Sequence, residues 1–304
     1  MSSAVAVGVF DGVHLGHRAL LEHAVRRARE RSVRCVVLSF DPHPDVVLSK
    51  GQFHIPAPLT PLPEKRARLL EMGVDELKVL PFTRELAALS PEEFVDWHLG
   101  PHVPFLLVVG EGFALGRGRS GNVGRLREIG ADRGFTVDVV PLVDREGAPV
   151  SSTRIRGLLG QGKVAEVEPL LGRPYGLTAM VVRGEGIGAT LGYPTANLRL
   201  HDEKFLPGDG IYAVRVRWGG DPAWRPGAMS IGVRPTFEGR VRTLEVYVLD
   251  WRGDLVGREM EVEFVDWLRP ELKFENAAAL VAAMDRDVAE TRRRLGLRPG
   301  PVGA

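Results

Sequence analysis

Residues 5–17 read Val-Ala-Val-Gly-Val-Phe-Asp-Gly-Val-His-Leu-Gly-His, and this stretch decides the fold of the first half of the chain. Its apolar beginning predicts a β-strand over residues 5–10, followed by a turn that contains glycine. A helix is predicted over residues 17–31, because leucine, alanine and valine recur on one face and arginine on the other. A strand that leads through a short turn into a helix is the typical opening of a β-α-β unit.

The same alternation continues to about residue 140. Four more apolar runs predict strands, and three amphipathic stretches between them predict helices. The predicted strands are residues 35–40, 77–80, 105–109 and 136–140, and the predicted helices are residues 63–72, 91–98 and 122–133. We therefore expect an α/β, Rossmann-like domain with a parallel sheet and flanking helices. Ligands of such sheets bind at the carboxyl ends of the strands.

The pattern changes near residue 151. Two short helices are predicted up to residue 172, and after them come strand patterns separated by glycine and proline with no room for helices. These strands are predicted at residues 177–183, 210–217, 229–233, 243–250 and 259–264, before a last helix at 277–295. Short strands in this arrangement indicate a small antiparallel β-barrel or sandwich, and we expect the barrel.

These patterns predict two domains and a short linker. We expect the α/β domain at residues 1–160, a linker at 161–172, the barrel domain at 173–297 and a flexible tail at 298–304. A chain of 304 residues is long enough for two domains that each bury their own core.

Composition excludes several classes of protein. There are 40 Lys+Arg and 39 Asp+Glu, so the formal net charge of +1 argues against a nucleic-acid binder. The single cysteine, Cys35, lies in an apolar run and is predicted to be a core residue. One cysteine excludes a disulfide scaffold and fits a reducing compartment. No run of 18 apolar residues and no signal peptide is visible, so we expect a cytoplasmic enzyme with no membrane contact. The oligomeric state is left open.

Two histidines at the predicted helix start indicate a phosphate site. The N-terminus of a helix attracts anions, and His14 and His17 can add hydrogen bonds to the phosphates of a nucleoside triphosphate. Gly12 lies in the turn, and Gly16 lets a nucleotide approach the backbone because it has no Cβ. This His-x-Gly-His pattern resembles the signature of the nucleotidyltransferase superfamily, in which it stabilises the pentavalent phosphate and the departing pyrophosphate.

A second cluster of the same kind begins at Ser151. Hydroxyl groups of Ser151, Ser152 and Thr153 and the guanidinium of Arg156, with that of Arg154, lie at another predicted helix start. Hydroxyl and guanidinium groups suit phosphate oxygens. Alone the segment would be an ordinary capped helix, but together with the histidines it matches the second phosphate-binding signature of the superfamily.

Four segments together make the resemblance specific. They are residues 10–17, 39–44, 109–113 with 116–121, and 151–156, in the order found in the bacterial bifunctional riboflavin kinase/FAD synthetase family. The resemblance implies a nucleotidyltransferase domain that transfers an adenylyl group from ATP to FMN, with Mg²⁺ assisting. It also implies that the segment Phe40, Asp41, Pro42, His43 and Pro44 lines the flavin side of that site.

The second half resembles the riboflavin kinase domain of the same family. Residues 190–197 contain Pro-Thr-Ala-Asn, and the resemblance implies that Thr195 and Asn197 hold the Mg²⁺ of the nucleotide. It further implies a phosphate flap at Gly184, Gly186 and Gly188. Glu245 matches the carboxylate that acts as general base towards the 5′-hydroxyl of riboflavin. The segments 206–213, 230–237 and 268–274 follow in family order.

The first domain departs from the family pattern at three positions. Gly112 lies where Asn or Asp is usual, Ala114 where a polar residue is frequent, and Pro149 where a basic residue is common. The leading hypothesis is an enzyme that makes FMN from riboflavin and ATP, and then FAD and pyrophosphate from FMN and ATP. One alternative is an active kinase whose first domain is weak or uses another nucleoside triphosphate, such as CTP. A second alternative is a flavin sensor without turnover.

Overall fold

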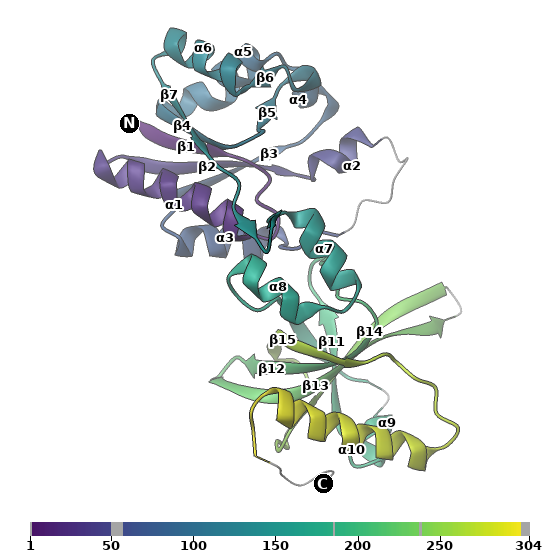
Figure 1. Ribbon diagram of the computed structural model, residues 1–304. Helices are drawn as coiled ribbons and strands as arrows, with labels where there is room; N and C mark the ends of the chain where they lie inside the picture. Colours follow the sequence, from purple (N-terminus) through teal and green to yellow (C-terminus); the bar gives the residue numbers. More distant parts are fainter. Residues whose placement is uncertain (1, 50–56, 185, 237–238, 299–304) are drawn as a thin grey trace. The chain divides into compact units, whose positions relative to one another are not determined.

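The computed structural model describes residues 2–49, 57–184, 186–236 and 239–298. The backbone divides between Ser152 and Thr153 into two compact units, called unit 1 and unit 2, and each is described by itself (Figure 1). The predicted domain boundaries at residues 160 and 173 remain predictions. Apart from residue 298, the predicted tail lies outside the described residues.

Unit 1 contains a five-stranded parallel sheet, which confirms the predicted α/β class. Its order is β3-β2-β1-β4-β7. The bounds are β1 Ser3–Val7, β2 Arg34–Asp41, β3 Glu76–Pro81, β4 Pro104–Gly110 and β7 Thr136–Val140. The chain adds β2 and β3 on one side of β1, and then β4 and β7 on the other. The carboxyl ends of β1 and β4 therefore form the switch point at which such sheets bind ligands.

The two faces of this sheet are covered by different helices. Alternate residues of β1 point to opposite faces: Ala4 and Ala6 join the core under α1, whereas Val5 and Val7 join the core under α5 and α6. The helices are α1 Leu15–Glu30, α3 Leu62–Glu71, α5 Pro91–Phe94 and α6 Val123–Arg133. Cys35 is fully buried in the first of these cores, as predicted.

Short elements of unit 1 have no strong sequence pattern and were not predicted. They are α2 Pro44–Leu48, α4 Arg84–Ala88, the 3-10 turns Gly100–His102 and Arg117–Arg119, and the paired strands β5 Ala114–Leu115 with β6 Gly121–Asn122 and β8 Asp144–Arg145 with β9 Ala148–Pro149. The helix predicted over residues 91–98 is α-helical only to Phe94 and continues as the π-helical turn Val95–Leu99.

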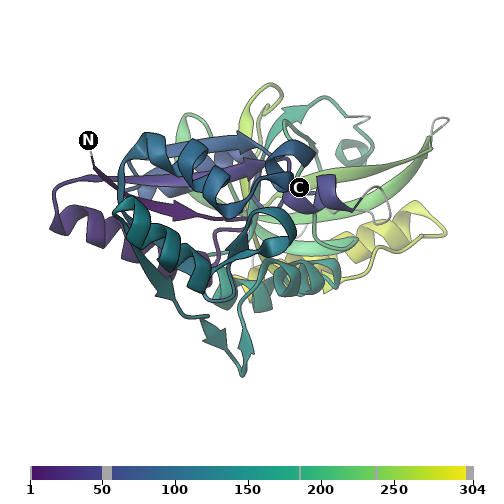
Figure 2. The same cartoon turned by 90° about the horizontal axis from the view of Figure 1, so that it is seen from above.

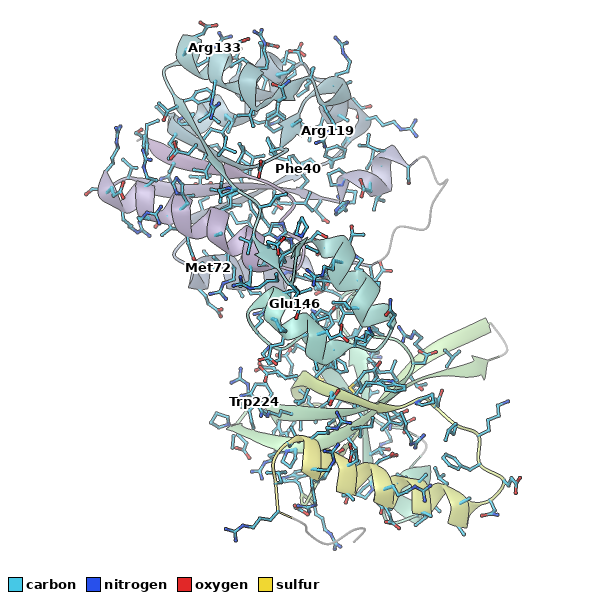
Figure 3. All side chains as sticks on the ribbon, in the orientation of Figure 1. Phe40, Met72, Arg119, Arg133, Glu146 and Trp224 are labelled. Carbon is cyan, nitrogen blue, oxygen red and sulfur yellow. The ribbon has the colours of Figure 1, made fainter. Side chains whose placement is uncertain are left out.

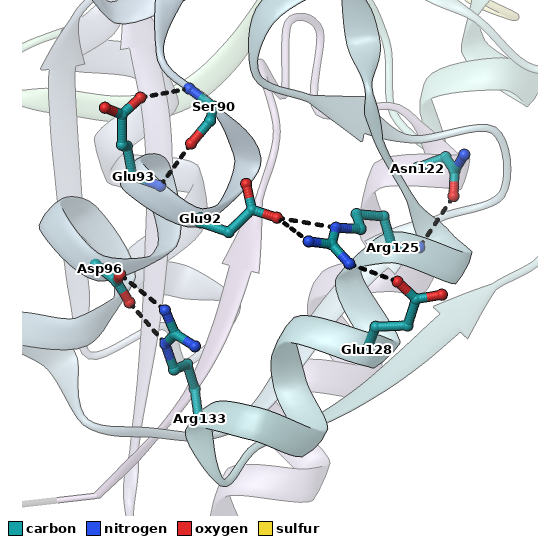
Figure 4. A network of polar contacts seen from close by, with 8 residues as sticks. All are labelled: Ser90, Glu92, Glu93, Asp96, Asn122, Arg125, Glu128 and Arg133. Atoms are coloured by element: carbon teal, nitrogen blue, oxygen red, sulfur yellow. Dashed lines mark hydrogen bonds and ion pairs between the residues drawn. The ribbon is translucent and has the colours of Figure 1, made fainter.

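Polar contacts tie α5 to α6 at the surface of unit 1 (Figure 4). The Glu93 N–H donates to Ser90 Oγ at 3.1 Å and the Ser90 N–H to the Glu93 carboxylate at 2.7 Å, which forms a capping box. Arg125 of α6 pairs with Glu92 of α5 at 2.6 Å. Exposed pairs contribute little to stability, so the buried apolar contacts between these helices and the sheet dominate.

Unit 2 begins with two short helices and continues into a closed antiparallel barrel, which confirms the predicted barrel class. The barrel has six strands, one more than the five that the sequence patterns predict. The barrel order is β10-β11-β14-β13-β12-β15, with antiparallel neighbours. The helices are α8 Val164–Leu171 and, beginning one residue before the unit boundary, α7 Ser152–Gly160. The strands are β10 Gly176–Val182, β11 Thr195–Leu200, β12 Gly210–Trp218, β13 Asp221–Thr236, β14 Gly239–Val248 and β15 Glu259–Arg269.

The last helix, α10 Ala277–Arg294, packs along the outside of the barrel against β12, β13 and β15 (Figures 1 and 2). Its Asp287 accepts two hydrogen bonds from Arg269 of β15 at 2.8 and 2.7 Å. Its Arg292 is only 8% exposed and donates to Asp250 at 2.5 and 2.7 Å. The Arg269–Asp287 pair is bidentate and largely buried, so it fixes the orientation of α10 on the barrel as well as its position. Among the helices that the structure describes, none is long and apolar enough to cross a membrane.

Candidate active sites

The turn after β1 has a strained backbone. The predicted strand 5–10 is too long, because β1 ends at Val7 and the chain then turns. Gly12 has φ +85°, and the non-glycine residues Phe10 and Val13 have φ +52° and +42°. Bulky residues rarely adopt positive φ, and such strain is concentrated at functional sites.

His14 and His17 lie together at the N-terminus of α1. His14 is the N-cap, and its Nδ1 accepts a hydrogen bond from the His17 N–H at 3.3 Å. The two rings stack with centroids 3.6 Å apart, and Phe10 packs edge-on against His17 at 5.4 Å. A Cβ at Gly16 would lie 3.2 Å from the His14 ring, so glycine accommodates this stacking.

The His17 ring is held neutral and has an unused nitrogen. Desolvation of the ring, assisted by His14 and Lys65, lowers the pKa of His17 well below its usual value. Its Nδ1 is shielded from solvent and has no hydrogen-bond partner within the residues described. A buried polar atom without a partner requires an explanation, and a bound phosphate oxygen would supply one.

Asp11 connects the two predicted phosphate signatures. Its side chain accepts hydrogen bonds from the N–H groups of Leu59 and Thr60 at 2.9 and 3.1 Å. Thr60 Oγ1 accepts from the Gly12 N–H at 2.9 Å, and Ser152 Oγ donates to the Asp11 carbonyl at 2.8 Å. Asp11 and Thr60 are 2% and 1% exposed, so these hydrogen bonds are buried and stabilise the turn after β1. Asp11 and Thr60 were not predicted as site residues, because their roles depend on contacts between distant parts of the sequence. Thr60 contacts Gly12, 48 residues away, and Asp11 contacts Ser152, 141 residues away.

The rest of the second signature lies around the start of α7. Ser151, Ser152 and Arg156 are half-buried, and Thr153 is exposed. Of these four, Ser152 makes the contact described above with the first signature. The roles predicted for Ser151, Thr153 and Arg156 remain predictions.

The segment predicted to line the flavin begins in the core and ends at the surface. Phe40, labelled in Figure 3, is 9% exposed and packs edge-on against Phe82 with ring centroids 5.6 Å apart. Asp41 and Pro42 are exposed, and Pro44 is half-buried. His43 caps α2, with its Nδ1 accepting from the Asp45 N–H at 3.1 Å. The flavin roles of these residues remain predictions.

Gly112 meets a backbone requirement at a position where the family usually has Asn or Asp. Its φ is +78°, a conformation that glycine adopts without strain and Asn and Asp tolerate. Its carbonyl accepts a hydrogen bond from Arg119 at 2.9 Å. Ala114 lies in β5 and Pro149 in β9, each in a two-stranded pairing. The backbone at residue 112 therefore has a conformation that Asn or Asp could also adopt, and glycine adds no polar side chain there.

The barrel brings together the three residues that were predicted for the kinase. Asn197 of β11 lies directly opposite Glu245 of β14 in the antiparallel register. Thr195, two residues earlier on β11, donates from Oγ1 to Glu245 Oε2 at 3.2 Å. Hydroxyl, amide and carboxylate oxygens are the hard donors that Mg²⁺ prefers, so this set fits that ion. Among the described residues there is no group of three or more His, Cys, Asp or Glu side chains that could hold a metal ion.

The predicted flap lies against this cluster. A Cβ at Gly184 would lie 2.1 Å from Asn197 Nδ2, and one at Gly188 would lie 2.3 Å from the Tyr193 carbonyl oxygen and 3.3 Å from Thr195 Oγ1. Gly186 has φ +73° and precedes the short helix α9, Ile187–Thr190. Glycine at 184 and 188 therefore permits a close approach that any side chain would prevent.

Tyr193 anchors the Pro-Thr-Ala-Asn segment and was not predicted to do so. Its ring is 1% exposed and packs edge-on against Tyr247, with ring centroids 5.1 Å apart. Its hydroxyl donates to Asp285 of α10, and burial together with that carboxylate raises the pKa of Tyr193. The strand that carries Thr195 and Asn197 is thus fixed to the last helix.

Taken together, a candidate anion site at a helix start in an α/β unit and an oxygen-donor cluster in a barrel are typical of an enzyme of phosphate transfer with two sites. Comparisons with known proteins agree with this class. Residues 1–154 match the FAD synthetase family model, and residues 171–295 match the riboflavin kinase model.

Curated relatives cover nearly the whole chain. Bifunctional riboflavin kinase/FMN adenylyltransferases from Listeria monocytogenes and Escherichia coli K12 are 36% and 37% identical, over 96% of this chain and 92–93% of theirs. A solved structure of a macrolide-efflux protein from Streptococcus pneumoniae is 32% identical, with a TM-score of 0.87 over 96% of this chain and 94% of that one. The chain belongs to the bifunctional riboflavin kinase/FMN adenylyltransferase family.

Proposed function

We propose that unit 1 joins FMN to the adenylyl group of ATP at His14 and His17, and that unit 2 phosphorylates riboflavin at Glu245. The enzyme makes FMN and ADP from riboflavin and ATP, and then FAD and pyrophosphate from FMN and a second ATP. The observation that carries the assignment in unit 1 is the stacked histidine pair at the start of α1, with an unpartnered, shielded Nδ1 on His17.

In adenylyl transfer the protein positions phosphates and stabilises charge. The N–H groups at the start of α1 attract the phosphate chain of ATP. A neutral His17 holds a phosphate oxygen by hydrogen bonding, and Gly16 leaves room above the backbone. The FMN phosphate attacks the α-phosphorus in line, and these donors stabilise the charge on the five-coordinate phosphorus and on the leaving pyrophosphate. The Asp11 network keeps Ser152 beside the same turn.

In the kinase reaction Glu245 takes the proton from the 5′-hydroxyl of riboflavin. Thr195 donates its own proton to Glu245, so its lone pairs are available for Mg²⁺, together with the Asn197 carbonyl. Bound Mg²⁺ would neutralise charge on the transferred phosphate. The glycines at 184, 186 and 188 bring the backbone close to the phosphates.

Three further assignments belong to the same proposal. The flavin side of unit 1 is assigned to Phe40–Pro44, which continues into α2 with exposed Val46 and Leu48 as apolar surface for an isoalloxazine ring. Residues 1–160 and 173–297 are assigned as the two domains, joined by 161–172. A cytoplasmic location is supported by the use of ATP and by the single reduced, buried cysteine.

The double substitution His14→Ala with His17→Ala tests the assignment in unit 1. Riboflavin, ATP and Mg²⁺ are supplied, and flavins are separated by chromatography. Loss of the phosphate donors should abolish FAD formation while FMN accumulates at the wild-type rate.

His23→Ala is the matched control, because His23 lies on the same helix but pairs with Asp138 at 2.7 Å, away from the turn. Its FAD formation should stay at the wild-type rate. Equal loss of FMN and FAD formation in the double variant would contradict two separate sites. Parallel reactions with CTP, GTP and UTP test the alternative nucleotides.

A further inference from the structure

Unit 1 buries a lysine at the same end of the sheet as the histidines. Lys65 lies on α3 and is only 7% exposed. Its Nζ donates a hydrogen bond to the carbonyl oxygen of Val9 at 2.9 Å. Val9 lies between the end of β1 and the turn that carries the histidines. The ammonium group therefore reaches the carboxyl end of the central strand, where ligands of this fold bind.

The charge of Lys65 is poorly compensated inside the protein. No carboxylate of the described residues lies within 4.0 Å of Nζ, and Asp11 and Asp41 act on it from farther away. Val9 uses one of the three N–H donors, and the part of the chain that the structure describes supplies no hydrogen-bond acceptor for the other two. Burying a charge is costly unless it is paired, and burial accordingly lowers the pKa of Lys65.

The signature turn itself lacks a cation. Residues 10–17 contain no lysine or arginine, and His17 is held neutral. Lys65 is one of the groups that lower the pKa of His17, so its positive charge acts electrostatically on the imidazole ring. A phosphate in this turn would receive hydrogen bonds from the histidines and the helix start, and a full positive charge from Lys65.

We propose that Lys65 is a catalytic residue of adenylyl transfer, with its ammonium group on a phosphate oxygen of the reacting FMN and ATP. A bond forms between an oxygen of the FMN phosphate and the α-phosphorus of ATP, and the bond from that phosphorus to pyrophosphate breaks. Pyrophosphate leaves with the electron pair, and Lys65 transfers no proton. Its charge stabilises the negative charge of the five-coordinate phosphorus. The proposal rests on the placement of adenylyl transfer at His14 and His17.

The alternative to a catalytic role is a structural one, in which Lys65 only holds the Val9 carbonyl in place. A comparison with Ser39 distinguishes these two roles of Lys65. Ser39 is fully buried, and its Oγ donates to the same Val9 carbonyl at 3.1 Å without bringing a charge. If the contact with Val9 is what matters, Ser39→Ala and a neutral residue at 65 should have similar effects. If the charge matters, only the changes at Lys65 should impair the reaction.

The experiment compares Lys65→Met, Lys65→Gln and Ser39→Ala in the full chain. Initial rates of FAD formation from FMN and ATP give kcat and both KM values, and FMN formation from riboflavin is measured on the same preparations. Both Lys65 variants should lower kcat for FAD formation on the order of 100-fold, the loss typical of one transition-state donor. Ser39→Ala should keep kcat near the wild-type value, and FMN formation should be unchanged in all three.

Lys65→Gln keeps a donor for Val9, so it carries the test if thermal unfolding shows that the Met variant does not fold. Wild-type kcat in Lys65→Gln, or equal losses in the Ser39 and Lys65 variants, would overturn the proposal. FAD formation that survives the double histidine change would refute the site itself. FAD formation that is lost with the histidines but kept without Lys65 would refute only the role of Lys65.

Discussion

At the scale of single residues, the kinase assignment depends on the carboxylate of Glu245. It accepts a hydrogen bond from Thr195 at 3.2 Å and lies opposite Asn197, so a base and two metal-binding oxygens share one patch of the barrel. Glu245→Gln keeps the shape but removes the base. We expect kcat for FMN formation to fall by about 10²–10⁴-fold, while FAD formation from supplied FMN stays unchanged. Both rates can be measured on the same preparation.

Glu261→Gln is the control for this substitution. Glu261 lies on β15 of the same barrel and pairs with Arg217 at 2.6 Å at the surface. Exposed pairs of this kind contribute little, so its kinase rate should match the wild type. A Glu245→Gln enzyme that makes FMN at the wild-type rate would show that the base lies elsewhere.

Sequence alone suggested candidate residues whose chemistry is visible in a short motif, and it did not suggest those whose proposed role depends on distant contacts. His14, His17, Thr195 and Asn197 lie in compact signatures. By contrast, Thr60 and Lys65 lie in a segment with no signature, and the roles proposed for them rest on contacts with Gly12 and Val9 that only the fold creates. Asn197 and Glu245 likewise lie opposite each other because of the register between β11 and β14, and a sequence motif does not specify register.

At the scale of elements, the flap tests whether close backbone approach shapes the kinase site. Gly184→Ala would place a Cβ 2.1 Å from Asn197 Nδ2, so the Asn197 side chain or the flap must move. We expect FMN formation to fall on the order of 10-fold or more, because misplacement by about 1 Å can cost 100-fold. The readout is kcat/KM for ATP in FMN formation, with FAD formation from FMN as the internal reference.

Gly219→Ala provides the matched control. Gly219 follows β12 in an exposed turn, and a Cβ there would meet nothing within 4 Å. The same chemical change should therefore leave FMN formation unaffected. Equal rates in the two variants would mean that the flap tolerates a side chain at 184.

Most elements were predictable because the spacing of their apolar residues along the chain matches the repeat of a helix or a strand. The helices α1, α6 and α10 and the strands β2, β4 and β7 lie within two residues of the predicted bounds. The strand β11 was missed although Thr195–Leu200 alternates polar and apolar residues, because the preceding Pro194 favoured a turn. The end of strand β1 was predicted three residues too late, because apolar Val9 and Phe10 continue the pattern into a strained turn.

At the scale of the whole molecule, each unit holds a complete set of proposed reacting groups. The histidines, Lys65 and the Asp11 network lie in unit 1, and the Thr195, Asn197 and Glu245 cluster lies in unit 2. A net charge of +1 is compatible with anionic substrates, because charge and donors are concentrated at two local sites. The only cysteine lies in unit 1, and it can therefore report on that unit alone.

Cys35 should react with alkylating reagents only when unit 1 opens. Its side chain is 0% exposed, and burial, with the nearby Asp75 carboxylate, raises the pKa of its thiol to about 12. The thiolate is the reactive form, so iodoacetamide at pH 8 should modify the unfolded chain but not the native enzyme. On stepwise heating, loss of FAD formation should accompany labelling of Cys35, measured by intact mass.

Because the folded thiol has the higher pKa, unit 1 should also lose stability as the pH rises from about 9 towards 12, where only the unfolded thiol ionises. A Cys35→Ala enzyme should lack that dependence, and labelling of an enzyme that keeps full FAD formation would contradict the buried placement.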